Sequence, residues 1–90
     1  MTSTLCVRKT PKPDDDELHF KLPVKQWFGR RFYDHDGSCG GGLLTIGPTE
    51  LPWLRGVLDA FSGEDADRIK LEKIAAWLDA GETVDIWFEV

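Results

Sequence analysis

The sequence has no long apolar run and few cysteines. None of its hydrophobic stretches approaches the ~18 residues that a membrane-spanning helix needs, so we expect no membrane segment. The first nine residues lack the extended apolar region of an export signal. The two cysteines, Cys6 and Cys39, are too few for a disulfide framework. These absences predict a cytoplasmic protein in which both cysteines are free thiols.

What the chain does have is the composition of one small globular domain. Its 90 residues are 41% hydrophobic and 30% charged, which is typical of neither a disordered nor a fibrous protein. A domain of this size buries roughly 60–65% of the surface that its unfolded chain exposes, enough for a hydrophobic core. We find no repeat or linker, so residues 1–90 are predicted to form a single domain.

Charge is distributed unevenly along the chain. Residues 1–33 carry seven basic and four acidic side chains, whereas residues 34–90 carry four basic and twelve acidic ones. The first segment therefore has a net charge of +3 and the second −8, within a total of −5. Such asymmetry is typical either of a protein with a charged partner or of a solvated helical face.

Apolar and polar residues alternate in three segments, which predicts half-buried strands at 5–8, 18–22 and 83–90. The last segment has the cleanest alternation, and Trp87 falls on its polar face. Residues 27–33 are rich in aromatics, a composition that favours a further strand. A glycine-rich loop at 34–42 and an apolar return at 43–46 complete a predicted hairpin.

Apolar residues recur at helical spacing in two segments, predicting helices over about 50–61 and 64–80. Gly56 lies inside the first helix, which suggests that a neighbouring backbone comes close to it. Gly81 follows the second helix, where a left-handed residue often ends a helix.

The predicted order is β-β-β-β-α-α-β. It favours an α+β two-layer sandwich, with an antiparallel or mixed sheet of four to five strands and two consecutive helices packed on one face. The predicted core joins the apolar faces of helices and strands: Leu54, Leu58, Phe61, Leu71, Ile74, Leu78, Val84, Ile86, Phe88, Leu18, Phe20 and Leu22.

The most chemically suggestive stretch contains Asp34, His35, Asp36 and Cys39. A calcium loop is excluded because its twelfth position is Thr45 rather than a glutamate. The chain also lacks the Cys-x-x-Cys spacing of common zinc sites. We therefore expect neither a metal nor a cofactor.

No catalytic motif stands out either. Ser38 and Cys39 lack a recognisable nucleophile motif. His19 and His35 form an acid–base pair only if the fold brings them together. We accordingly predict a protein that is not an enzyme.

The alternative is a small nucleic-acid-binding protein or enzyme that uses residues 25–39. Aromatic side chains can stack on bases and arginines can hold phosphate, and this segment supplies Trp27, Arg30, Arg31 and Tyr33. The segment does not match the ribonucleoprotein signature, and the whole chain is acidic. Direct nucleic-acid binding is therefore the less favoured hypothesis.

The favoured hypothesis is a small acidic interaction protein that modulates or inhibits a macromolecular partner. Its negative helical half would occupy a basic surface of nucleic-acid-processing machinery. Small acidic inhibitors from phages and mobile elements, such as anti-CRISPR proteins, are similar in size and charge, although no motif links them to this chain. The oligomeric state, a homodimer included, is left open. The predicted partner-binding residues are Glu64, Asp65, Asp67, Glu72, Asp79 and Trp87.

Overall fold

The chain folds into one four-stranded sheet and three helices in a computed structural model, which describes residues 4–10, 17–34, 42–63 and 65–89. The elements are β1 (Thr4–Thr10), β2 (Leu18–Phe20), α1 (Val24–Phe32), β3 (Leu44–Ile46), the short 3-10 helix η1 (Pro48–Glu50), α2 (Leu51–Ala60), α3 (Asp65–Asp79) and β4 (Thr83–Glu89).

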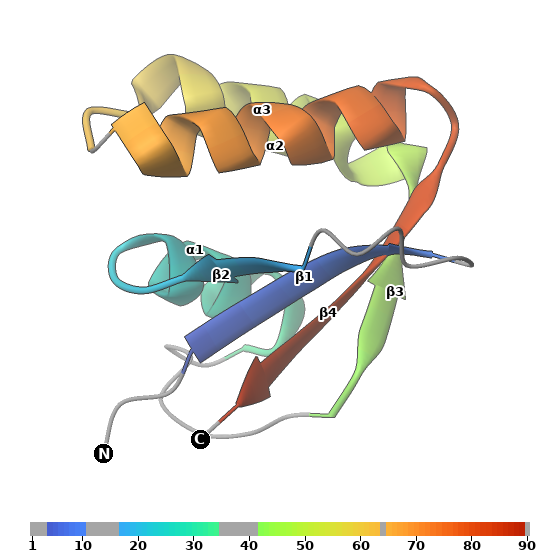
Figure 1. Cartoon of the computed structure of the whole chain (residues 1–90), viewed down its shortest axis with the longest axis horizontal. Coiled ribbons are helices and arrows are strands. Elements are labelled where there is room, and N and C mark those ends of the chain that lie inside the picture. Colours follow the sequence, from blue (N-terminus) through green and yellow to red (C-terminus); the bar gives the residue numbers. More distant parts are fainter. Residues whose placement is uncertain (1–3, 11–16, 35–41, 64, 90) are drawn as a thin grey trace.

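The sheet has the strand order β2-β1-β4-β3, and all three neighbouring pairs are antiparallel. The long strands β1 and β4 form its centre, in a register that places Thr4 opposite Glu89 and Thr10 opposite Thr83. Figure 1 shows α2 and α3 side by side over one face of this sheet. The predicted α+β class with an antiparallel sheet is therefore confirmed.

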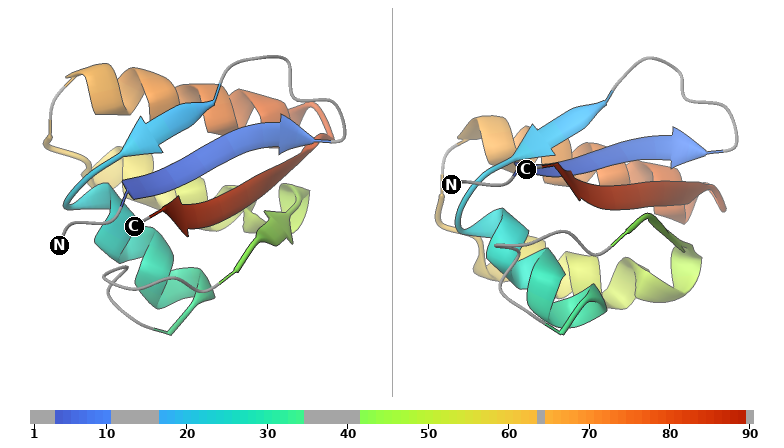
Figure 2. Two further views of the ribbon diagram at one scale, coloured as in Figure 1. Left: turned by 60° about the horizontal axis from the view of Figure 1, so that its bottom comes forward. Right: turned by 90° about the horizontal axis from the view of Figure 1, so that it is seen from below.

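Alternation along the strands gives the sheet an apolar and a polar face. Leu5 and Val7 in β1 and Val84 and Ile86 in β4 are fully buried on the apolar face. Successive side chains of a strand point to opposite faces. The residues that alternate with these buried ones therefore lie on the polar face. All three helices contribute to the core on the apolar face, and Figure 2 shows α1 beside α2.

Helix α3 forms as its sequence pattern predicts. Leu71, Ile74 and Leu78 are buried on one stripe, at most 1% exposed. Asp65 in the first turn complements the positive end of the helix dipole. Gly81 has a φ of +86° and donates its N–H to the carbonyl of Leu78 at 3.0 Å. The predicted left-handed residue therefore ends the helix.

The prediction of a strand at residues 27–33 is wrong, because residues 27–32 belong to helix α1 and Tyr33 caps its end. Val24 and Phe28 lie one helical turn apart and are both fully buried, and Phe28 stacks on Phe20 with ring centroids 6.3 Å apart. A helical period that begins at Val24 therefore outweighs the strand-like composition of the aromatic run.

The predicted hairpin is wrong as well, since β3 pairs with β4 and not with residues 27–33. The observed order is β-β-α-β-α-α-β. The tip of the predicted hairpin, residues 35–41, lies outside the described residues.

The core largely follows the prediction. Leu58 is only partly buried against the core. The prediction that Leu22 belongs to the core is wrong: 62% of its surface is exposed, because β2 ends at Phe20. The core also includes residues that were not predicted, namely Leu5, Val7, Val24, Phe28 and Ile46.

Candidate functional site

A stripe of carboxylates lies on the outer face of α3. Asp65, Glu72 and Asp79 follow one another at intervals of seven residues, so they share one side of the helix, and all three are exposed. At 1.5 Å per residue the stripe is about 21 Å long. Ile69, 64% exposed, lies within it. We call Asp65, Ile69, Glu72 and Asp79 the α3 outer face.

Two basic side chains of α3 are engaged with the protein itself. Arg68 donates to the backbone carbonyl of Phe61 at 2.7 Å, and its guanidinium lies over the Phe61 ring. Lys70 donates to the backbone carbonyl of His19 at 3.0 Å. Both side chains are half-buried. Their charges are therefore turned toward the sheet and α2 rather than toward the outer face.

The remaining basic residues of α2 and α3 also have partners. Arg55 pairs with Asp79 at 3.0 Å, where both side chains are more than 60% exposed, and Lys73 lies over the ring of Trp77. An exposed ion pair contributes little to stability, but the positive charge of Arg55 does offset much of the negative charge of Asp79. Asp65 and Glu72 therefore dominate the charge of the α3 outer face.

The structure does not gather all predicted partner-binding residues on one surface. Asp67 is half-buried, Glu64 lies outside the described residues, and Trp87 is on the polar face of the sheet, away from α3. Trp87 is half-buried beneath the guanidinium of Arg8, 5.0 Å from the ring centroid. Asp65, Glu72 and Asp79 therefore lie on one face of the molecule and Trp87 on another.

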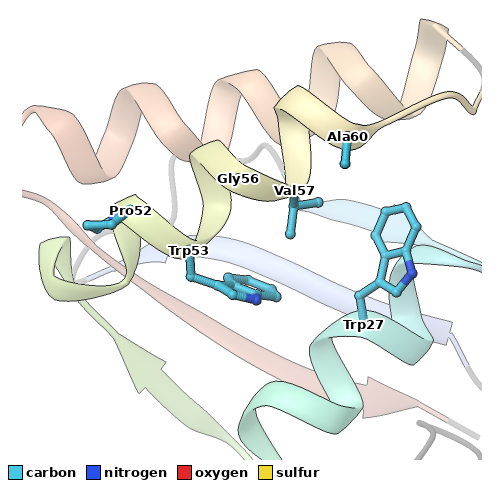
Figure 3. Close-up of a pocket in the computed structure, with 6 residues that line it drawn as sticks. All are labelled: Trp27, Pro52, Trp53, Gly56, Val57 and Ala60. Carbon is cyan, nitrogen blue, oxygen red and sulfur yellow. The ribbon is translucent and has the colours of Figure 1, made fainter.

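A groove of about 530 Å³ lies between Trp27 of α1 and the facing side of α2. Figure 3 shows Trp27 of α1 and Trp53 and Val57 of α2 pointing into the same space. Gly56 also lines it, and a Cβ at that position would meet nothing within 4 Å. The predicted close approach to Gly56 is therefore wrong. The full lining is Trp27, Pro52, Trp53, Gly56, Val57 and Ala60.

The other residues of the alternative site have different environments. Arg30 and Arg31 are both exposed, and Arg31 pairs with Glu50 at 2.9 Å. The hydroxyl of Tyr33 lies 2.7 Å from the carbonyl oxygen of Gly42 and 3.0 Å from that of Ile86, and burial raises the pKa of Tyr33. Tyr33 therefore ties α1 to the sheet.

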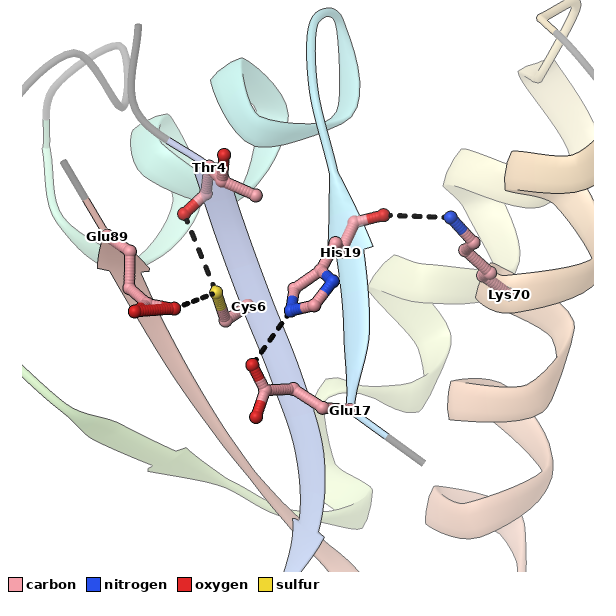
Figure 4. Close-up of polar contacts among 6 residues, drawn as sticks. All are labelled: Thr4, Cys6, Glu17, His19, Lys70 and Glu89. Carbon is pink, nitrogen blue, oxygen red and sulfur yellow. Dashed lines mark hydrogen bonds and ion pairs between the residues drawn. The ribbon is translucent and has the colours of Figure 1, made fainter. Parts of the chain in front are cut away.

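A compact polar cluster lies on the polar face of the sheet. Figure 4 shows Cys6 of β1 between Glu89 of β4 and His19 of β2. The Cys6 thiol donates to Oε2 of Glu89 at 3.1 Å, and Nε2 of His19 lies 2.7 Å from Oε1 of Glu17. One ligand atom from each of these residues lies within 4.8 Å of all the others. We call Cys6, Glu17, His19 and Glu89 the sheet cluster.

Strand register explains why these residues meet. Cys6 lies directly opposite His19 in the β1–β2 pair, and Glu89 pairs with Thr4, two residues from Cys6 on the same face. Cys6 is fully buried, while the other three members are exposed. Burial, followed by the hydrogen bond to Glu89, raises the pKa of the Cys6 thiol to about 12. The thiol is therefore protonated at neutral pH.

Sequence reasoning did not find the sheet cluster because it looked for ligands close together along the chain. Alternation had already assigned His19 and Glu89 to the polar sides of their strands, but only pairing in the correct register makes them neighbours. His35, Asp36 and Cys39 lie outside the described residues, and Asp34, which is described, is exposed after α1.

Comparisons with protein-family models, curated proteins and solved structures found no match to this chain. Among the described helices, none is both long and apolar enough to cross a membrane. Functional hypotheses therefore rest on the chain's own surfaces.

Proposed function

We propose that this chain is a non-catalytic interaction protein whose α3 outer face binds a basic surface of a partner protein, of the kind that receives nucleic acid. The observation that carries the proposal is the regular spacing of Asp65, Glu72 and Asp79 along one exposed side of α3. A row of carboxylates on a rigid helix presents negative charge in a fixed geometry, which suits recognition of a basic groove.

The inward-facing basic side chains of α3 support this proposal. Arg68 and Lys70 donate to backbone carbonyls on the inner side of α3, so the helix presents a more negative outer surface than its composition suggests. Exposed charges act over a Debye length of ~8 Å at physiological ionic strength. We therefore expect the stripe mainly to speed association with the partner, in a way that depends on salt, and to have less effect on the dissociation rate.

Charge reversal on α3 tests the proposal. The wild-type chain and the Asp65→Lys/Glu72→Lys variant serve as paired baits in cells of the organism that encodes the chain. Association of each captured partner is then measured at rising salt. We expect the variant to associate at least about 10-fold more slowly at low salt, with the difference shrinking as salt rises. Association that is indifferent to both salt and reversal would contradict the proposal.

A matched pair of single variants controls for net charge. Glu72→Gln and Asp34→Asn each remove one exposed carboxylate, but Asp34 follows α1 instead of lying on α3. Asparagine also tolerates the left-handed backbone of Asp34, whose φ is 62°. Glu72→Gln is expected to slow association, and Asp34→Asn to leave it nearly unchanged. Equal effects would mean that total charge matters and the α3 outer face does not.

The groove favours a second candidate, binding of single-stranded nucleic acid. Trp27 and Trp53 line an apolar groove, and exposed Arg30 belongs to the same helix as Trp27. Bases stack on aromatic rings while arginine holds phosphate. Titration of the wild type and Trp27→Ala with a fluorescent oligonucleotide separates the candidates: salt-sensitive binding lost in Trp27→Ala favours the groove, and no binding eliminates it.

A further inference from the structure

We propose that the sheet cluster binds one zinc ion. Its members offer a thiolate, an imidazole and two carboxylates, all of which are zinc ligands. Calcium and magnesium prefer sites made of oxygen alone, so the sulfur of Cys6 and the nitrogen of His19 select against them. The proposal departs from the sequence-based expectation of no metal because that expectation considered spacing along the chain and not across strands.

The distances fit a tetrahedral site after small side-chain movements. Zinc–nitrogen and zinc–sulfur bonds of about 2.0–2.3 Å place neighbouring ligand atoms about 3.3–3.8 Å apart in a tetrahedron. The cluster's ligand atoms all lie within 4.8 Å of one another, and its two closest pairs are 2.7 and 3.1 Å apart. The side chains of Glu17, His19 and Glu89 are exposed and can rotate, while Cys6 is held in the central strand.

Zinc would take the place of shared protons. The thiol of Cys6 donates a hydrogen bond to Glu89, and Nε2 of His19 forms a second short contact with Glu17. On binding, the Cys6 proton is released to solvent and the thiolate bonds to zinc. His19 binds the metal as a neutral imidazole with its proton on Nδ1, which leaves the Nε2 lone pair free for zinc. A bound Zn²⁺ with one thiolate and two carboxylates has a net charge of −1.

The site would fasten three strands together, because its ligands come from β1, β4 and the segment containing β2. It lies on the polar face of the sheet, away from the α3 outer face. Zinc binding and partner binding therefore use separate residues, and loss of one leaves the other measurable.

Cobalt(II) substitution tests the proposal, because a cobalt–thiolate bond produces an ultraviolet charge-transfer band. The chain has two cysteines and two histidines. In an untagged Cys39→Ser/His35→Ala background, Cys6 and His19 are therefore the remaining thiol and imidazole. We expect this background to keep the band, to bind one cobalt per chain, and to release cobalt when zinc is added.

Adding Cys6→Ser to that background is expected to abolish the band and to weaken zinc binding at least about 10-fold, since even the outer partners of zinc ligands are worth 10–100-fold in affinity. Adding His19→Ala, a change at an exposed side chain, provides a second test if Cys6→Ser does not fold. Circular dichroism checks the fold of each variant. No band in the background, or a band and a zinc affinity that survive loss of the ligand, would overturn the proposal.

Discussion

Alkylation of Cys6 offers a quantitative test of the geometry around the thiol. Its pKa is raised from 9.0 to about 12 by burial and by Glu89. At pH 8 the thiolate fraction therefore falls from about one-tenth to about one ten-thousandth, roughly 1000-fold. A more basic thiolate is also a better nucleophile, and with a Brønsted slope of 0.4–0.5 this recovers about 15–30-fold. The net expectation is a reaction roughly 30–60-fold slower than that of a free thiol, with burial slowing it further.

The assay is iodoacetamide labelling of the metal-free Cys39→Ser variant, followed by intact-protein mass spectrometry. The same protein unfolded in urea gives the reference rate. Glu89→Gln removes the negative acceptor of the thiol hydrogen bond and should accelerate native labelling. Native labelling at the unfolded rate would refute the buried, hydrogen-bonded environment assigned to Cys6. Labelling that is slow but insensitive to Glu89→Gln would refute the role of Glu89.

Four further outcomes are expected. In urea unfolding, Leu78→Ala, at a side chain only 1% exposed, should cost ~2–5 kcal/mol, whereas Ile69→Ala on the outer side of α3 should stay within about 0.5 kcal/mol; equal costs would contradict the register of the helix. Gly56→Ala should stabilise the protein by ~0.5–1 kcal/mol, because the new Cβ lies in a helix interior and meets nothing within 4 Å, and a lower melting midpoint would count against this. Tyr33→Phe should cost roughly 0.5–1.5 kcal/mol by the same unfolding assay, since its hydroxyl lies near two backbone carbonyls, and an unchanged midpoint would mean that those contacts add no stability. Because the folded-state pKa of Cys6 is raised, its contribution to stability is complete below pH 9.0 and is lost as the pH rises toward about 12; a pH series of urea midpoints on Cys39→Ser and Cys39→Ser/Cys6→Ala should show a steeper alkaline decline in the former.

Local pattern predicted those elements whose period is unbroken. The strict alternation of β4 and the stripe of Leu71, Ile74 and Leu78 in α3 each specify one buried face. In α1, by contrast, strand-forming aromatic residues conceal a helical period that starts at Val24. The contact of Phe28 with Phe20 and Trp53 depends on segments distant in the sequence, which composition cannot reveal.

The candidate sites divide in the same way. The acidic character of α3 could be read directly from the sequence, although the partners of its basic residues could not. The sheet cluster depends on register: a shift of one residue between β1 and β2 would place Cys6 opposite Leu18 or Phe20 instead of His19. Alternation placed His19 and Glu89 on the polar sides of their strands, and the pairing of the strands brought them next to Cys6.

Site-specific photocrosslinking tests most directly whether the α3 outer face binds a partner. A photoreactive phenylalanine analogue replaces Ile69, which is 64% exposed between Asp65 and Glu72, or Thr45, which is exposed on β3. In the cells that encode the chain, we expect a crosslinked partner from position 69, its yield falling at high salt and in the Asp65→Lys/Glu72→Lys variant, and none from position 45. A partner crosslinked from position 45 alone, or a yield at position 69 that ignores both salt and reversal, would contradict the proposed function.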